Sequence, residues 1–319
     1  LETNIEEIID TKMLKQIYFK SSDYSHAIGI KDTLIHDDYF YISLVDSIKE
    51  NCYMTSVLRA KFSKETTYLN FEYFFKPSFC LKNKDNTALI ISGGALEINP
   101  NNNKLYLSVG DYRHWDKASK KDNVLGKILE IDLNSKEYVI FSSGHRNPLG
   151  IYFDETNEIL FSAEMGPHYG DEINLLERNE NYGWPVSSYG LHYGNYKGDH
   201  PLANLVELAP LHKSHKDYGY KEPLFSFSPY FDRQNIMLEK LAAGPALKNI
   251  EKNILDQSEN TFMVFGMKSM KIYKFEFAQG SLQLNEIIDL GFRVRDVKTL
   301  KNYYLLTEEK GPSLIMLKK

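Results

Sequence analysis

One unit recurs in this sequence: an apolar segment of strand length, a short acidic or asparagine-rich turn, and a second such segment. It appears as ALEINPNNNKLYLSVGD at 95–111, LGIYFDETNEILFSAEMG at 149–166 and VRDVKTLKNYYLLTEEKG at 294–311. A period of roughly 50 residues is typical of β-propellers, whose blades are four-stranded sheets around a central channel. A pair of β-sandwiches would not explain why each unit ends in a loop with glycine or an acidic residue. The pattern predicts an all-β fold, a β-propeller of four-stranded blades.

The composition supports a sheet protein. The 319 residues include 22 Tyr and 18 Phe, which favour pleated, half-buried strands, and helical periodicity is nearly absent. Strand-length segments bounded by turn signals include Lys104–Val109 and Val294–Leu300. The formal net charge of −5 argues against nucleic acid or an anionic membrane as partner. No run approaches the roughly 18 apolar residues that a membrane span needs.

We expect residues 1–319 to form a single propeller domain. Residues 1–26 are too few for a complete blade, so we interpret them as the remnant of a first blade or as a segment that closes the ring. The strand pattern lapses at 181–223 into Tyr, Gly, His and Pro, which predicts a long loop insertion on one face. Because the sequence begins at Leu1, we expect that a signal peptide, a tag or a longer upstream segment has been removed.

The sequence contains two cysteines, Cys52 and Cys80. They could form one disulfide in an oxidising compartment, and a pair of buried free thiols is an equal alternative. The sequence does not decide between them.

Two stretches in the middle of the chain are specific enough to indicate a family. GHRNPLGIYFD at Gly144–Asp154 is followed by EMGPHYGDEINLLERNENYGWPVSSYG at Glu164–Gly190. Together they resemble the soluble quinoprotein sugar dehydrogenases, which oxidise glucose, sorbosone or other aldoses with pyrroloquinoline quinone (PQQ). The resemblance implies a six-bladed propeller, with the first blade short or incomplete in this chain, and a periplasmic or secreted protein.

The same resemblance implies two calcium sites. In the family, backbone carbonyls at a tight turn hold the calcium that grips the quinone, and the matching residues here are Gly166 and Pro167. Backbone carbonyls suit a hard cation that takes several oxygen ligands. A second family calcium uses a glutamate and a carbonyl ten residues later, a spacing kept by Glu172 and Tyr182. The structural alternative is that these stretches only turn corners in the chain.

PQQ carries three carboxylates, so its site needs fixed cations and hydrogen-bond donors. Arg146 and Asn147 match the family's quinone-contacting pair, and Arg293 and Arg295 match its paired arginines. The two arginines are predicted to alternate on a strand, so both side chains point to the same side. Lys268 matches the family's cofactor lysine more loosely, because a second lysine lies three positions on.

The sequence departs from the family where the catalytic base is expected. The family's histidine, which takes the hydroxyl proton during hydride transfer, falls on Ile91, and its arginine falls on Ala95. Isoleucine cannot accept a proton, and loss of a general base costs about 10²–10⁴ in rate. His114 and His168 are candidate substitutes in nearby loops.

Two functions follow from these residues. The first is a PQQ- and calcium-dependent aldose or sorbosone dehydrogenase acting on a small sugar. The alternative is a non-catalytic propeller that keeps the scaffold and binds a glycan or a protein partner. Ile91 and the tyrosine-rich 181–223 insertion favour the alternative, because exposed aromatic side chains stack on sugars and anchor interfaces.

Overall fold

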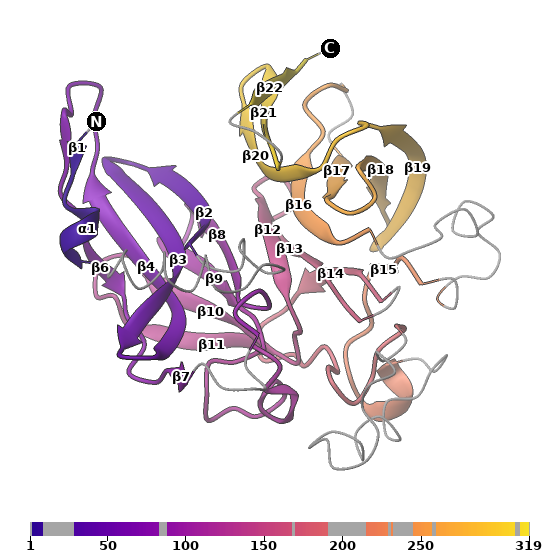
Figure 1. The fold of residues 1–319 in the computed structure, drawn as a ribbon. Helices are drawn as coiled ribbons and strands as arrows, with labels where there is room; N and C mark the ends of the chain where they lie inside the picture. Colours follow the sequence, from indigo (N-terminus) through magenta and orange to yellow (C-terminus); the bar gives the residue numbers. More distant parts are fainter. Residues whose placement is uncertain are drawn as a thin grey trace.

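The computed structural model describes residues 2–8, 29–82, 88–167, 170–190, 215–228, 231, 245–256, 260–309 and 313–318. Within these ranges the chain forms five successive antiparallel sheets, arranged around a common centre like the blades of a propeller (Figure 1). The first strands of neighbouring sheets, β2, β8, β12, β16 and β20, contact one another at this centre. The all-β propeller prediction is therefore confirmed.

The blades are consecutive in the sequence. The first contains β2 (Gly29–His36), β3 (Tyr39–Lys49), β4 (Cys52–Lys61) and β6 (Glu72–Phe75), with β7 (Leu81–Lys82) paired to β4. The second contains β8 (Gly93–Asn99), β9 (Lys104–Val109), β10 (Lys127–Asp132) and β11 (Tyr138–Ser143). The third contains β12 (Pro148–Asp154), β13 (Ile159–Glu164), β14 (Glu172–Leu176) and β15 (Phe225–Ser226).

The last two blades follow in the same way. The fourth contains β16 (Leu247–Lys252), β17 (Thr261–Gly266), β18 (Lys271–Ala278) and β19 (Ser281–Asp289). The fifth has three strands, β20 (Val294–Leu300), β21 (Tyr303–Glu308) and β22 (Leu314–Leu317). Outside the blades, β1 (Glu2–Thr3) pairs in parallel with β5 (Tyr68–Leu69), and the short helical segments are α1 (Ile5–Ile8), η1 (Trp115–Lys117) and η2 (His215–Tyr218).

The six-bladed prediction is wrong for the described part of the chain, which forms five blades. The reason lies in the third blade: residues 177–224 separate β14 from β15 within one sheet, so this long stretch adds no blade. The predicted insertion at 181–223 falls inside that separation, with 191–214 outside the described residues. The predicted first-blade remnant, 1–26, is described only at 2–8, where β1 and α1 lie beside the first blade (Figure 1).

The hydrophobic core lies between blades, because both faces of each inner sheet are covered by neighbouring sheets. One cluster joins the first and second blades, with Val57 and Leu107 among its fully buried members. A second joins the third and fourth blades around Phe161 and Phe262, whose ring centroids are 5.0 Å apart. A third joins the fourth and fifth blades, where Phe265 meets Tyr304. Side chains alternate between the two faces along each strand, so every second side chain faces the neighbouring blade on one side.

Every central strand is irregular near its beginning. The register shifts between Ile30 and Asp32 in β2, between Pro148 and Gly150 in β12, between Leu247 and Asn249 in β16, and between Val294 and Asp296 in β20. A shift also occurs in β8 between Gly93 and Leu96. Such β-bulges add one unpaired residue and re-aim its side chain. The irregularity recurs in all five blades, and it leaves one residue out of the register in β2, β12, β16 and β20 and two in β8.

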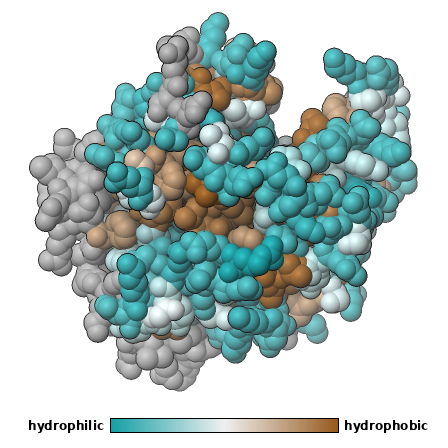
Figure 2. Space-filling model, turned by 180° about the vertical axis from the view of Figure 1, so that it is seen from behind, coloured by the Kyte–Doolittle hydropathy of each residue, from teal (hydrophilic) through white to brown (hydrophobic). Residues whose placement is uncertain are grey.

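The first and fifth blades do not pack on each other as the other neighbours do. Figure 1 shows an open side between β20–β22 and the first blade, and Figure 2, from behind, shows a notch in the outline there. Lys298 of β20 pairs with Asp32 of β2 across this side, and Lys248 of β16, in the fourth blade, donates from Nζ to the Lys31 carbonyl of β2 at 3.3 Å. Figure 2 also shows a mostly hydrophilic surface around a central apolar area.

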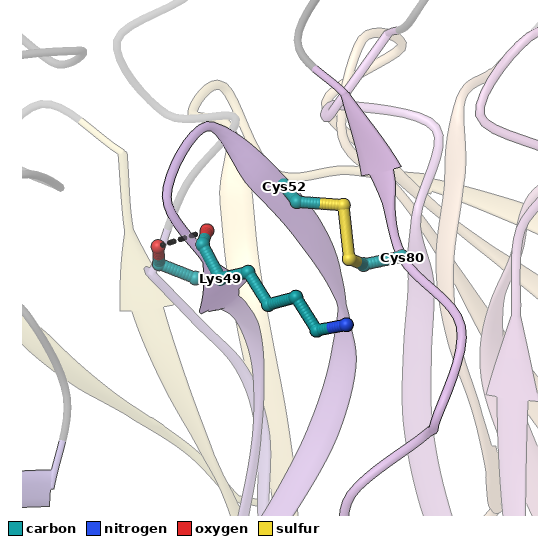
Figure 3. The surroundings of a disulfide bond; sticks show 4 residues. Lys49, Cys52 and Cys80 are labelled. Atoms are coloured by element: carbon teal, nitrogen blue, oxygen red, sulfur yellow. Dashed lines mark hydrogen bonds between the residues drawn. A yellow bond between two sulfur atoms is a disulfide. The ribbon is translucent and has the colours of Figure 1, made fainter.

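Cys52 and Cys80 form a disulfide, which settles the open alternative. Cys52 begins β4, and Cys80 lies in the segment that leads to β7; their Cα atoms are 5.4 Å apart (Figure 3). The bridge lies beside the β3–β4 turn, where Ser47 Oγ donates to the Lys49 carbonyl. In the described ranges no helix has the length and hydrophobicity of a membrane span.

Candidate functional site

A cavity of about 520 Å³ opens at the centre of the propeller, at the level of the bulges. Its volume falls in the usual range for small-molecule sites, about 300–1,000 Å³. The bulge residues of four central strands line it: Lys31 from β2, Leu149 from β12, Lys248 from β16 and Arg295 from β20. A backbone irregularity shared by these blades therefore builds the wall of the cavity.

Four of the five predicted cofactor residues line this cavity: Asn147, Lys268, Arg293 and Arg295. The strand argument for the two arginines is wrong, however. β20 begins at Val294, so Arg293 precedes the strand and Arg295 is its bulge residue. The two side chains reach one cavity because of the bulge and not because of strand alternation.

Asn147 is fully buried at the cavity wall. Its Oδ1 accepts a hydrogen bond from the Gly93 backbone N–H at 3.0 Å, which fixes the orientation of the amide. Its Nδ2 has no hydrogen-bond partner within the described part of the chain. Buried donors are nearly always satisfied, so this amide is suited to an acceptor supplied by a bound molecule.

The fifth predicted cofactor residue, Arg146, does not line the cavity. Arg146 is 5% exposed, and its guanidinium donates from Nη1 to the carbonyls of Met165 and Gly166, each at 2.9 Å, and lies over the Trp184 ring. Glu164 accepts from the Arg146 backbone N–H. Since Met165 is a lining residue, Arg146 supports the cavity wall from behind in this structure.

Cations dominate the cavity wall. Lys31, Lys248, Lys268, Arg293 and Arg295 face two carboxylates, Asp32 and Asp296. The arginines share one outer partner, because Glu309 pairs with Arg293 and lies 3.8 Å from Arg295 Nη1. Burial, then the positive charge of Arg293, lowers the pKa of Arg295 against the opposing effect of Glu309. A concave site of this charge attracts anionic ligands.

The lysines and carboxylates of the wall affect one another. Burial, followed by the charges of Lys248 and Arg295, lowers the pKa of Lys31 to about 7. Burial alone would raise the pKa of Asp32, but the ammonium groups of Lys298 and Lys248 hold it below its usual value. Lys31 can therefore lose its proton near neutral pH, because burial and the charges of its cationic neighbours both disfavour its charged form.

The first predicted calcium position is engaged by the chain itself. The Gly166 carbonyl accepts from the Arg146 guanidinium, and the Pro167 carbonyl accepts from the Gly170 N–H at 2.8 Å. A side chain at position 166 would collide with the Gly170 carbonyl, since a Cβ there would lie 1.8 Å away, so the turn requires glycine. A guanidinium and a calcium ion repel each other, so this geometry does not fit calcium at the Gly166 carbonyl.

At the second predicted calcium position, the glutamate also has a partner within the protein. Glu172 is buried at the start of β14, and its Oε1 lies 3.8 Å from Nε2 of His215. His215 Nδ1 donates to the Lys221 carbonyl, and the ring stacks on Tyr189. Burial and the charges of nearby carboxylates raise the pKa of Glu172 well above its usual value. The predicted ligand at Tyr182 is its backbone carbonyl, which stays a prediction; its ring packs on His145, and its hydroxyl donates to the Leu175 carbonyl.

Comparison with known proteins agrees with the resemblance. Residues 12–316 match the family described as glucose/sorbosone dehydrogenase. The chain belongs to this family. Among curated relatives it is 25% identical over 228 residues to the aldose sugar dehydrogenase YliI of Escherichia coli K12, covering 66% of this chain and 56% of that protein. It is 36% identical over 104 residues to quinoprotein glucose dehydrogenase B of Acinetobacter calcoaceticus, covering 29% and 20%.

Solved structures of the family share the fold. The soluble aldose sugar dehydrogenase of Escherichia coli in the apo form superposes with a TM-score of 0.71 at 19% identity, covering 92% of this chain and 82% of that one. The PQQ-bound aldose sugar dehydrogenase of Streptomyces coelicolor gives a TM-score of 0.58 at 16% identity, covering 88% and 75%. The chain spans little more than half the length of the YliI relative and less of the Acinetobacter enzyme.

The histidine position of the glucose/sorbosone dehydrogenase family, Ile91, is buried and 4% exposed. Its N–H donates to Ala88 and its carbonyl accepts from Tyr112, so the residue forms part of a turn before β8. Ala95 is likewise buried in β8. Of the substitutes, His114 precedes η1 and is not a lining residue of the cavity, and His168 lies outside the described residues.

The sequence analysis did not predict two cationic residues of the cavity wall, Lys31 and Lys248. Each lysine follows an apolar residue at the start of its central strand, β2 or β16. The charged residues in these two strands obscure the alternation of apolar and polar residues that would identify a strand. The signal that could have found them is the repeat itself: the corresponding position of the fifth blade is Arg295, a predicted cofactor residue. Comparing blades position by position would have placed all three side chains at one level.

Proposed function

We propose that this family member is a sugar dehydrogenase that binds PQQ in the central cavity. The observation that carries the proposal is the convergence of Asn147, Lys268, Arg293 and Arg295 on one cavity of suitable volume. Three carboxylates need several fixed cations, and the wall supplies five against two carboxylates. Bound there, the quinone would supply a two-electron acceptor for the oxidation of a sugar hydroxyl.

The residues of this chain would have separate tasks. Arg293, Arg295 and Lys268 would pair with carboxylates of the cofactor, and the free Nδ2–H group of Asn147 would donate to one of its oxygens. Arg146 would hold the Met165–Gly166 backbone in place behind it. Calcium has no part in this proposal, because the carbonyl of Gly166 and the carboxylate of Glu172 face Arg146 and His215.

The test begins with cofactor binding. Purified protein titrated with PQQ should show a saturable change in the quinone absorbance, and the loaded protein should reduce an artificial electron acceptor in the presence of some aldoses of a panel. A matched double variant, Arg293→Gln with Arg295→Gln, should bind PQQ far more weakly. If PQQ causes no saturable absorbance or calorimetric signal, the proposal is wrong.

One observation favours a second function, a non-catalytic propeller that binds a glycan or protein partner. The buried Ile91 occupies the position of the family's base, so the family's own route to proton removal is absent. PQQ binding with no oxidation of any sugar in the panel would support this second function. Gain of activity in Ile91→His would identify a scaffold that had lost its base.

We propose further that the protein is periplasmic or secreted. The disulfide between Cys52 and Cys80 supports this placement, because such bridges persist in oxidising compartments. Fractionation of the source cells, followed by gel migration with and without reductant, would test both the compartment and the bridge.

A further inference from the structure

Oxidation of a sugar hydroxyl requires a group that takes its proton, and this inference rests on the proposed function. Ile91 cannot supply that group. His145 is fully buried, and both ring nitrogens are engaged, by Glu164 at 3.0 Å and Ser142 at 2.8 Å. Among the described residues that line the cavity there is no histidine. The base must therefore be sought among the lysines and carboxylates of the wall.

The two carboxylates of the wall are already surrounded by ammonium groups. Asp32 pairs with Lys298 and also accepts the Leu96 N–H at 2.8 Å. Asp296 lies between two lysines, 4.0 Å from Lys248 and 3.9 Å from Lys298. The charges of Lys298 and Lys248 keep the pKa of Asp32 below its usual value, whereas burial raises the pKa of Asp296 against the same two lysines. Asp32 is therefore stabilised in the charged form, and Asp296 is the carboxylate of the wall that competes with the lysines for the role of base.

Lys31 approaches the segment in which the family carries its base. It is the bulge residue of β2, and its stem lies against Gly94, three positions after Ile91. A Cβ at position 94 would lie 2.4 Å from Lys31 Cβ, so the missing side chain of this glycine, whose φ is +105°, makes room for the lysine. The amine thus reaches the cavity from the strand opposite the family's histidine position.

The surroundings of Lys31 favour a neutral amine. Lys248 faces it from β16, Arg295 from β20, and Lys268 and Arg293 from the loops that precede β18 and β20. Asp296 and the neighbouring Asp32 lie at the same wall, each paired with other lysines. Together with burial, this mainly cationic environment brings the pKa of Lys31 to about 7. A base with such a value is half-deprotonated at neutral pH.

We propose that Lys31 is the general base of the sugar oxidation, in place of the family's histidine. The neutral Nζ takes the proton of the anomeric hydroxyl as the C1–O bond becomes double. The C1–H bond breaks, and its electron pair leaves as hydride for the quinone. The sugar is oxidised by two electrons to the lactone, the quinone is reduced by two, and Lys31 afterwards passes its proton to the reduced cofactor or to water.

The decisive variant is Lys31→Arg, which keeps a cation at the same place but cannot lose its proton near neutral pH. We expect kcat to fall by about 10²–10⁴, the loss typical of a missing base, while PQQ affinity changes by no more than about threefold. Lys31→Met should show a similar loss of kcat. Lys61→Met, at the exposed end of β4, is the matched control and should behave like wild type.

A second measurement does not depend on activity. In cofactor-free protein whose lysines carry ¹³C-methyl groups, one NMR signal should titrate near pH 7 and should be missing in Lys31→Met. In loaded wild type, the acidic limb of the kcat/KM profile should follow the same ionisation. Lys31→Arg should lose that limb, a change that a purely structural role would not produce.

The outcomes separate the two proposals. Failure of wild type to bind PQQ would overturn the proposed function and the role of Lys31 with it. Binding without oxidation of any sugar would support the non-catalytic propeller and overturn the base. Full activity of Lys31→Arg in a PQQ-binding enzyme would overturn the base alone, and Asp296→Asn would then be the variant expected to lose activity.

Discussion

The central strands carry cations at the bulged end of the passage and two carboxyls of raised pKa further along. At the bulged end, the cavity wall presents Lys31, Lys248 and Arg295. Further along the central strands, where the pairing is regular again, lie Glu97 of β8 and Glu251 of β16, and the charge of Glu251 helps to raise the pKa of Glu97. The comparison shows that a bulge changes the direction of one residue in each strand and thereby gives an otherwise uniform passage a cationic cavity at one end only.

The two ends also differ in the state of their ionisable groups. Burial, then the negative charges of Glu251 and Asp32, raises the pKa of Glu97 to about 8. Burial likewise raises the pKa of Glu251 to about 7, against the opposing hydrogen bond from Thr299. At pH 7 the carboxyl of Glu97 is therefore mostly protonated, and that of Glu251 is about half protonated. The positive charge that could bind an anionic ligand is therefore concentrated at the bulged end.

The largest expected effect concerns the ion pair that lies between the two ends and bridges the open side. Lys298→Met leaves the buried carboxylate of Asp32 without its main partner, so we expect a loss of about 2–3 kcal/mol in unfolding free energy. This is less than for a fully buried pair, because the Lys298 side chain is 37% exposed. Urea unfolding measures it, with Lys301→Met as a surface control. A loss below about 0.5 kcal/mol would show that the bridge contributes little.

The comparison of the two ends can be tested by ligand affinity. Arg295→Gln removes one charged hydrogen-bonding group from the cavity wall, and PQQ affinity should fall about 10- to 100-fold. Glu251→Gln, at the acidic end of a neighbouring strand, should leave the affinity unchanged. Absorbance titration of both variants measures the difference. Equal losses would mean that the ligand extends along the whole passage.

The ionisable groups at the two ends should change the free energy of unfolding with pH in opposite directions. The raised pKa of Glu97 means that the folded state holds a proton that the unfolded state releases, so stability falls as pH rises from about 4.5 to 8. The lowered pKa of Lys31 acts in reverse, and its contribution makes stability rise between about pH 7 and 10.5. Urea midpoints across this range should pass through a minimum near pH 7–8. In Glu97→Gln the acidic slope should flatten; an unchanged slope would contradict the assignment.

The smallest expected effect is the response to calcium. Because Arg146 and His215 engage the family's metal positions, millimolar calcium or a chelator should shift the melting temperature by less than about 1 °C. A tightly bound ion would raise it by several degrees. Differential scanning calorimetry decides the point. A large rise would show that both side chains yield their positions to the ion.

The sequence predicted the fold from strand-length segments that recur with turn signals between them. Lys104–Val109 and Val294–Leu300 have the predicted bounds in the structure. β2 and β16 were not predicted, because a bulge and several charged residues obscure the period of two. β20 has both features as well, and it was found because it belongs to the recurring unit VRDVKTLKNYYLLTEEKG. Asn147 and the arginines were found through the family motif, whereas Lys31 and Lys248 depend on a backbone irregularity that residue types do not reveal.

Because the first and fifth blades do not pack on each other, the described blades form a linear array and not a closed ring. Each of the three middle blades is held by two neighbours, whereas the first and fifth have one such neighbour each. In linear arrays, stability is a sum over neighbouring interfaces, and unravelling starts at the ends. The Cys52–Cys80 bridge crosses one of these terminal blades and limits the freedom of its unfolded chain. The three-stranded blade at the other end has no such crosslink within the described residues, so hydrogen exchange should spread inward from the β20–β22 side.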